Sequence, residues 1–196
     1  MIAAPGGFGE GRLTLGEQAR EQHRALHLGA RIQLDLKREA QPVSGGEPVG
    51  DLSASAQGLR GAELDGDLVL RAIDEVPILA VLGAMASGTT VIRGAAELRV
   101  KESDRLAQMA RGLRAMGAQV EELPDGLRIT GAGGGRPLHG AEIDSAHDHR
   151  IALAFTVAAL GADSPTLISG AEWADVSFPG FFDLLRSLGA EVELVA

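Results

Sequence analysis

The sequence predicts an α/β fold built from repeated β-α-β-α-β-β units, the first of which is truncated. One junction occurs three times, at 26–32, 113–120 and 185–192: an apolar helical pattern ends at a glycine and a strand pattern starts at once. Glycine is the residue that most easily takes the left-handed conformation at a helix C-terminus. A single junction of this kind is common between a helix and a strand, but three copies favour an internal repeat.

The segment upstream of the junction repeats as well, and it defines the length of the unit. The strand pattern TVIRGA at 90–95 returns as TLISGA at 166–171. With the surrounding helices, these matches give one almost complete unit over 66–130 and a second over 139–195, which lacks only its closing strand. A partial copy over 15–54 carries the last helix and two strands.

Periodicity places the individual elements along the chain. Apolar residues spaced three and four apart predict helices, near 15–28, 75–87, 103–116, 148–160 and 178–188. Short β-branched or alternating runs bounded by turn residues predict strands, near 30–36, 47–54, 66–70, 89–93, 118–123, 126–130, 139–143, 165–169 and 190–195. Pro and Gly in LPDG at 123–126 predict a hairpin turn. Glycine- and proline-rich stretches predict loops at 38–50 and 131–137.

Composition excludes several classes of protein. The 196 residues include 18 basic and 27 acidic side chains, a net charge of −9, which argues against binding to a phosphate backbone. There is no cysteine, so disulfides and thiolate metal sites are excluded. The longest apolar run, 151–162, is shorter than the ~18–20 residues of a membrane span. The first residues show no secretory signal. We therefore expect a cytoplasmic protein that binds neither nucleic acid nor membranes.

The segment 97–105, ELRVKESDR, carries the strongest chemical signal. It holds Lys101, one of only two lysines in the chain, and Arg105 lies in the first turn of the helix that follows. Ser103 is a good N-cap. Cations at a helix N-terminus oppose the macrodipole, unless a phosphate or carboxylate docks there. A solvated charge cluster is the alternative.

A second helix start, HDHR at 147–150, has the same character. Two helix N-termini with cations favour one shared anion site. His147 and His149 lack a third metal ligand in the sequence, so a metal site is not predicted. Asp74, before the helix at 75–87, is explained as an N-cap, and a carboxylate facing two cationic helix starts is also placed to act as a general base.

Four segments together resemble the carboxy-terminal lobe of the 5-enolpyruvylshikimate-3-phosphate (EPSP) synthase family, the 3-phosphoshikimate 1-carboxyvinyltransferases. They are AIDEVPILAV (72–81), ELRVKESDRL (97–106), DHRIALAF (148–155) and SFPGFFDLLRSLGA (177–190), in family order. The resemblance covers 29–196 and leaves 1–28 as a divergent segment. It implies an inside-out α/β fold of two lobes, each built from three β-α-β-α-β-β units.

The resemblance also implies a reaction and the residues that perform it. Members transfer the enolpyruvyl group of phosphoenolpyruvate to the 5-hydroxyl of shikimate 3-phosphate, with no metal or organic cofactor. Carried over by motif, Asp74 would be the base on that hydroxyl. Glu102 would serve proton transfer at the enol carbon, and Lys101 would contact the reacting region and the substrate.

The remaining implied roles concern binding, and two positions depart from the common pattern. Arg105, His149 and Arg150 would hold the phosphate and carboxylate of phosphoenolpyruvate. Glu97 stands where many members have an asparagine that helps to bind shikimate 3-phosphate. Val176 stands where many have a lysine.

The amino-terminal lobe of the family is not recognisable in this sequence. We therefore expect a transferase that needs a separate amino-terminal lobe for turnover. Two alternatives stay open: a non-catalytic anion-binding fragment of the family, and the sister reaction on UDP-N-acetylglucosamine. The motifs RVKESDR and DHR favour the shikimate branch over the sister reaction.

Overall fold

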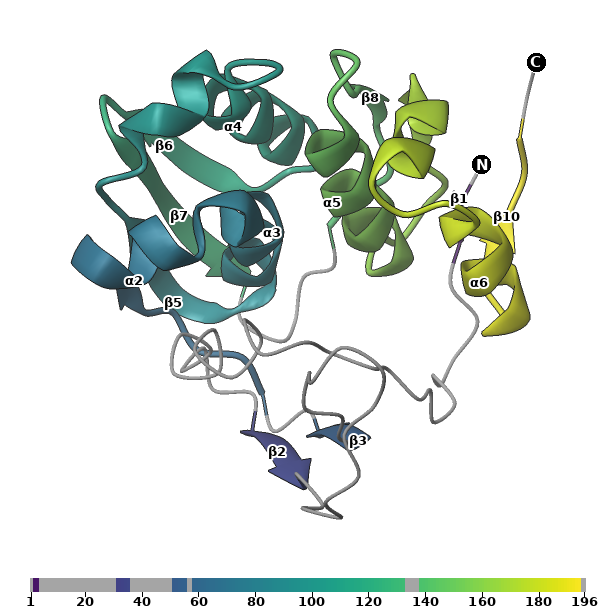
Figure 1. Ribbon diagram of the computed structural model, residues 1–196, viewed down its shortest axis with the longest axis horizontal. Coiled ribbons are helices and arrows are strands. Elements are labelled where there is room, and N and C mark those ends of the chain that lie inside the picture. The colour runs from purple at the N-terminus through teal and green to yellow at the C-terminus, as the bar shows by residue number, and fades with distance from the viewer. Residues whose placement is uncertain (1, 4–30, 36–50, 56–57, 133–137, 195–196) are drawn as a thin grey trace, which may run out of the picture.

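The computed structural model describes residues 2–3, 31–35, 51–55, 58–132 and 138–194. Within these ranges the chain forms the predicted α/β fold with repeated units (Figure 1). The predicted helix at 15–28 and most of the segment 1–28 lie outside the described residues, as do the whole loop predicted at 38–50 and residues 133–137 of the second predicted loop.

The first complete unit contains a four-stranded sheet in the order β4-β5-β7-β6. β4 pairs parallel with β5, whereas β7 lies between β5 and β6 and is antiparallel to both. The strands are β4 (Glu63–Leu64), β5 (Ser87–Ile92), β6 (Gln119–Leu123) and β7 (Gly126–Ala132). The helices are α2 (Gly66–Arg71), α3 (Val76–Met85) and α4 (Arg105–Ala115), with short 3-10 turns at Ile73–Glu75 and Ala96–Val100.

The second unit repeats this plan, and its strands β9 and β10 are shorter than their counterparts β5 and β6. β8 pairs parallel with β9, as β4 does with β5. Its elements are β8 (Glu142–Asp144), α5 (His149–Leu160), β9 (Leu167–Ser169), a 3-10 turn at Ala171–Val176, α6 (Phe181–Ser187) and β10 (Glu191–Val192).

The closing strand that the second unit lacks in sequence is replaced from the other end of the chain. β1 (Ile2–Ala3) pairs antiparallel with β10, as β7 pairs with β6. A further antiparallel pair, β2 (Arg31–Asp35) and β3 (Asp51–Ser55), matches the two strands of the predicted partial copy.

The main core lies where the two units meet. Helix α3 is buried on most sides, because it packs against β7 of its own sheet and against α5 of the next unit (Figure 1). Helices α4 and α5 also pack closely, and Gly112 makes this possible: a Cβ there would lie 2.1 Å from the Phe155 ring. The N-termini of α4 and α5 are thereby held near the start of α3.

Two sequence predictions about local structure are wrong. Residues 66–70, predicted as a strand, form helix α2, and the first strand of the unit lies just before them as β4. A short apolar run such as DLVL fits either element, and here Gly66 to Arg71 continues into the turn that leads to α3. The helix predicted from 178 begins only after Gly180, which takes the left-handed conformation. Within the described residues, no helix is long and apolar enough to cross a membrane.

Candidate functional site

The predicted site residues meet at one place, where the 3-10 turn before α3 faces the N-termini of α4 and α5. Arg105 Nη1 lies 3.2 Å from Asp74 Oδ1, and Arg150 Nη2 lies 3.9 Å from Asp74 Oδ2. These three residues come from three separate sequence motifs. The convergence expected from the two cationic helix starts and the acidic turn is therefore present.

Arg105 is the centre of the cluster, and only 2% of its side chain is exposed. Besides Asp74, it donates to Glu102 Oε2 at 2.6 Å and to both carboxylate oxygens of Asp148. Desolvation lowers the pKa of Arg105, but the hydrogen bonds and charges of Asp148, together with the charges of Glu102 and Asp74, outweigh it, so the pKa lies above its ordinary value. The guanidinium is thus a permanent, fixed cation.

Asp148 is the fully buried partner of Arg105. Its Oδ2 accepts from Arg105 Nε at 2.8 Å and from Ser103 Oγ at 2.9 Å. Its Oδ1 accepts from the backbone N–H of Arg150 at 2.9 Å, which makes Asp148 the N-cap of α5. Burial raises the pKa of Asp148, but the hydrogen bonds from Arg105 and Ser103 and the charge of Arg105 lower it further, so the net pKa is below its ordinary value.

Arg150 extends the cluster toward the turn before α3. Its Nη1 lies 3.5 Å from Glu75 Oε1, and its side chain is about one-third exposed. Its buried Nε has no hydrogen-bond partner among the described residues. His149 is the first residue of α5 and is half-buried beside it.

Lys101 and Glu97 form the outer side of the cluster. Lys101 Nζ lies 2.5 Å from Glu97 Oε1, one helical turn away in sequence. The hydrogen bond to Glu97 is the main cause that raises the pKa of Lys101, and the charge of Asp74 adds to it. Lys101 is therefore protonated at neutral pH.

Two of the predicted helix caps are wrong. The N-cap of α4 is Asp104, whose Oδ1 accepts from Ala107 N at 3.0 Å, and Ser103 instead donates to Asp148. Asp74 makes no cap hydrogen bond, because it lies inside a 3-10 turn and its carboxylate faces the two arginines. In both cases an interaction across the cluster replaces a local one.

The comparisons with known proteins agree on one family. The family model described as EPSP synthase (3-phosphoshikimate 1-carboxyvinyltransferase) matches residues 22–185. The chain belongs to the EPSP synthase family. The match begins ahead of the boundary at residue 29 expected from the sequence.

Relatives and solved structures of the EPSP synthase family are similar to different extents. A 3-phosphoshikimate 1-carboxyvinyltransferase of Synechococcus sp. (strain JA-3-3Ab) is 54% identical over 161 residues, which are 82% of this chain and 35% of the relative. An EPSP synthase structure from Acinetobacter baumannii matches with a TM-score of 0.78 and 39% identity, covering 91% of this chain and 40% of that one. The enolpyruvyl transferase NikO from Streptomyces tendae matches with a TM-score of 0.64 and 25% identity, over 88% of this chain and 36% of that one. The chain spans about a third of the length of the curated relatives that it matches.

The charge balance of the cluster decides what it can bind by itself. Its three cations, Lys101, Arg105 and Arg150, each face at least one carboxylate. The carboxylates outnumber them: they are Asp74, Glu75, Glu97, Glu102 and Asp148. An incoming anion therefore has to displace a carboxylate or meet additional cations.

Sequence reasoning missed two members of this cluster, Glu75 and Asp148. Glu75 follows Asp74 directly, and an acidic pair opposite cationic helix starts was the signal available for it. For Asp148 the signal was its place directly before a cationic first turn, where an aspartate is a favoured N-cap.

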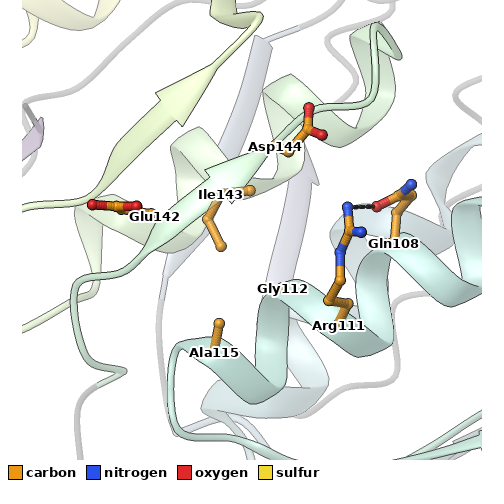
Figure 2. A pocket seen from close by; sticks show the side chains of 7 residues that line it. All are labelled: Gln108, Arg111, Gly112, Ala115, Glu142, Ile143 and Asp144. Carbon is orange, nitrogen blue, oxygen red and sulfur yellow. Dashed lines mark hydrogen bonds between the residues drawn. The ribbon is translucent and has the colours of Figure 1, made fainter.

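A groove lies away from this cluster, between α4 and β8 (Figure 2). It has a volume of about 230 Å³. Ile143 points from β8 toward α4, and Arg111 donates to Gln108 one turn earlier on α4. None of its lining residues belongs to the cluster. Among the described residues, no group of three or more His, Asp or Glu is placed to hold a metal ion.

Proposed function

We propose that this chain supplies the carboxy-terminal half of the active site of a cytoplasmic 3-phosphoshikimate 1-carboxyvinyltransferase. The observation that carries the proposal is the convergence of Asp74, Arg105 and Arg150 in a family member. The substrates are phosphoenolpyruvate and shikimate 3-phosphate. The product is the enolpyruvyl ether, a step of aromatic amino acid biosynthesis.

The acids of the cluster have opposite tasks in an addition followed by an elimination. Asp74 takes the proton of the 5-hydroxyl as that oxygen bonds to C2 of phosphoenolpyruvate, while a proton from Glu102 reaches the methylene carbon and makes it a methyl group. In the elimination the methyl carbon returns its proton to Glu102, the double bond re-forms as the C2–O bond to phosphate breaks, and inorganic phosphate leaves with the proton that Asp74 had taken. Asp74 and Glu102 both contact Arg105, which supports their action on neighbouring atoms of one substrate.

The cations stabilise the charge of phosphoenolpyruvate and of the tetrahedral intermediate. The cations Arg105 and Arg150 lie in the first turns of α4 and α5, with the side chain of His149 next to Arg150 in sequence, and backbone N–H groups there add to the positive potential. Lys101 and Glu97 contact shikimate 3-phosphate at the outer side. Because carboxylates outnumber cations here, further positive charge has to come from the part of the enzyme that this chain does not cover.

The same charge balance disfavours a stand-alone anion-binding module. Such a module would present at least one cation without a carboxylate partner, and each cation that the cluster contributes is paired. We therefore propose that turnover requires a separate amino-terminal lobe.

Reconstitution tests this proposal. The chain is mixed with the part of the Synechococcus relative that it does not cover, and inorganic phosphate release is measured with both substrates. We expect release only when both pieces are present. A covalent version, in which residues 22–185 replace the matched segment of the relative, removes the need for association. A folded graft that binds both substrates but releases no phosphate would contradict the proposal.

The variant Arg105→Ala tests the site within the reconstituted enzyme. Loss of one preorganised charge-stabilising group is expected to cost about 2–4 kcal/mol in the transition state. Arg99→Ala is the matched control, because Arg99 lies in the same motif but contacts the β6–β7 turn instead of the cluster. Equal rates in the two variants would refute the assigned role of Arg105.

A further inference from the structure

We propose that Asp148 is a positioning residue that holds the guanidinium of Arg105 in the orientation needed to receive phosphoenolpyruvate. This inference rests on the proposed function for the identity of the ligand. The placement of Arg105 by Asp148 can be tested without it. Asp148 was assigned no role by the sequence motifs.

The contacts of Asp148 tie together three parts of the chain. Arg105 is the first residue of α4, Ser103 lies in the loop before it, and Arg150 lies in the first turn of α5. Asp148 accepts from all three, through 2.8 and 3.2 Å bonds to Arg105, a 2.9 Å bond to Ser103 and a 2.9 Å bond to the Arg150 N–H. One carboxylate therefore sets the distance between the two helix starts.

Asp148 is also the only fully buried carboxylate among the described partners of Arg105. The side chains of Asp74 and Glu102 are 44% and 48% exposed, whereas that of Asp148 is 0% exposed. Exposed carboxylates can exchange an arginine for water at little cost, but a buried pair has no such alternative. The Asp148 contacts are thus the ones that persist when a ligand displaces the outer carboxylates.

The geometry of the pair leaves one side of Arg105 for the ligand. The two carboxylate oxygens of Asp148 accept from Nε and Nη2 of Arg105. This bidentate pairing fixes the plane of the guanidinium. Nη1 and the rest of Nη2 face Asp74 and Glu102, which are the groups proposed to act on the substrate. Without Asp148 the Arg105 side chain would be free to rotate about its χ angles. Its Nη1 and Nη2 would then no longer point toward Asp74 and Glu102.

Asp148→Asn is the sharpest variant, because it preserves shape and can still cap α5 through its amide oxygen. Its NH₂ group would then face the Nε–H of Arg105, so that donor meets donor there, whereas the Ser103 hydroxyl can turn to accept. Asp104→Asn is the matched control: Asp104 is the N-cap of α4 and pairs with Arg99, not with Arg105.

The first measurement uses the chain alone and reads the Nε–H signal of Arg105 by ¹⁵N NMR. We expect a signal protected from solvent exchange in the parent and in Asp104→Asn, and loss of that protection in Asp148→Asn. Equal protection in all three proteins would overturn the proposal. An inactive reconstituted enzyme would leave this result intact, so failure of the proposed function is distinguishable.

The second measurement uses the reconstituted enzyme. Asp148→Asn is expected to lower kcat/KM for phosphoenolpyruvate by about 10- to 100-fold, the usual loss when a residue that orients a binding group is changed. The KM for shikimate 3-phosphate should stay unchanged. Combined with Arg105→Ala, Asp148→Asn should cost nothing more, because the group it positions is gone. Losses that multiply, or a KM that rises for both substrates, would show a general structural role instead.

Ser103→Ala covers the case in which Asp148→Asn does not fold. It removes one donor to Asp148 and leaves the Arg105 contacts in place. A smaller loss in the same direction, confined to phosphoenolpyruvate, supports the proposal, and an unchanged kcat/KM together with unchanged Arg105 protection contradicts it.

Discussion

Arg99 and Arg105 lie in one motif, and each pairs with an aspartate that caps a helix. Arg99 contacts Asp104, the N-cap of α4, and Arg105 contacts Asp148, the N-cap of α5. Arg99 also donates to Glu122 and to the carbonyl oxygens of Pro124 and Leu123 at the β6–β7 turn. Their side chains are 26% and 2% exposed, respectively.

This difference in burial separates a structural arginine from a site arginine. Arg99 and its carboxylate partners Asp104 and Glu122 are all partly exposed, so these pairs resemble surface ion pairs, which contribute little on average. Arg105 is surrounded by carboxylates in the interior, where loss of one partner leaves an uncompensated charge. The same residue type in the same motif therefore has two energetic roles.

Asp148→Ala should give the largest destabilisation. Removing the buried partner of Arg105 is expected to lower the free energy of unfolding by about 3–5 kcal/mol, because the guanidinium stays buried without its main counter-charge. Urea denaturation followed by circular dichroism measures the change. A loss under 1 kcal/mol would mean that water reaches Arg105 freely, and the contrast with Arg99 would disappear.

The pair of Arg105 and Asp148 should also affect how the free energy of unfolding depends on pH. The pKa of Asp148 is lower in the folded chain than in the unfolded chain, so the unfolded state binds more protons at acidic pH. The contribution of Asp148 is complete above its unfolded pKa of about 4 and is lost as the pH falls through the lower folded pKa. Asp148→Asn should therefore flatten the unfolding free energy measured between neutral and acidic pH. An unchanged slope in this variant would contradict the prediction.

Arg99→Ala should have an intermediate effect. It removes the hydrogen bonds to the Pro124 and Leu123 carbonyls, which other donors or water can partly replace at this partly exposed site. We expect a loss of about 1–2 kcal/mol of unfolding free energy. Thermal unfolding checks it, and a loss as large as that of Asp148→Ala would show that exposure is not what separates the two arginines.

Asp104→Ala should have the smallest effect. The loss of a helix N-cap costs about 1 kcal/mol, and the partly exposed pair with Arg99 adds little. Repeating the measurement in 1 M NaCl, where the Debye length is about 3 Å, should reduce only the ion-pair part of the loss. The loss of unfolding free energy in Asp148→Ala should be nearly independent of salt. Equal salt sensitivity of Asp104→Ala and Asp148→Ala would contradict the proposed difference between an exposed and a buried arginine pair.

The sequence predicted those parts of the fold that local pattern determines. Helices α4 and α5 were found within two residues of their observed starts, because each begins at a polar residue and continues with apolar spacing. The hairpin at 123–126 followed from proline and glycine. The run at 66–70 was misassigned, since five residues do not distinguish the two periodicities.

The sequence named side chains that the structure brings together, but it did not predict the contacts between them. Asp74, Arg105 and Arg150 were named because charged residues at helix starts are visible in a sequence. The partner of Ser103 was misjudged because a serine before a helix fits a local cap, and the competing acceptor lies 45 residues away. Which carboxylate is buried depends on how two units pack, and no local pattern carries that information.

The bond between Arg105 and Asp148 spans 43 residues and joins the two repeat units. It can close only when the helix start of the second unit has reached that of the first, so the loop-closure entropy of the intervening residues opposes its formation. Until then the guanidinium stays hydrated, and drying it early would raise the folding barrier. Assembly of the two units and completion of the charged cluster around Arg105 are therefore one event, and a chain in which the units have not yet met would lack this cluster as well as its final shape.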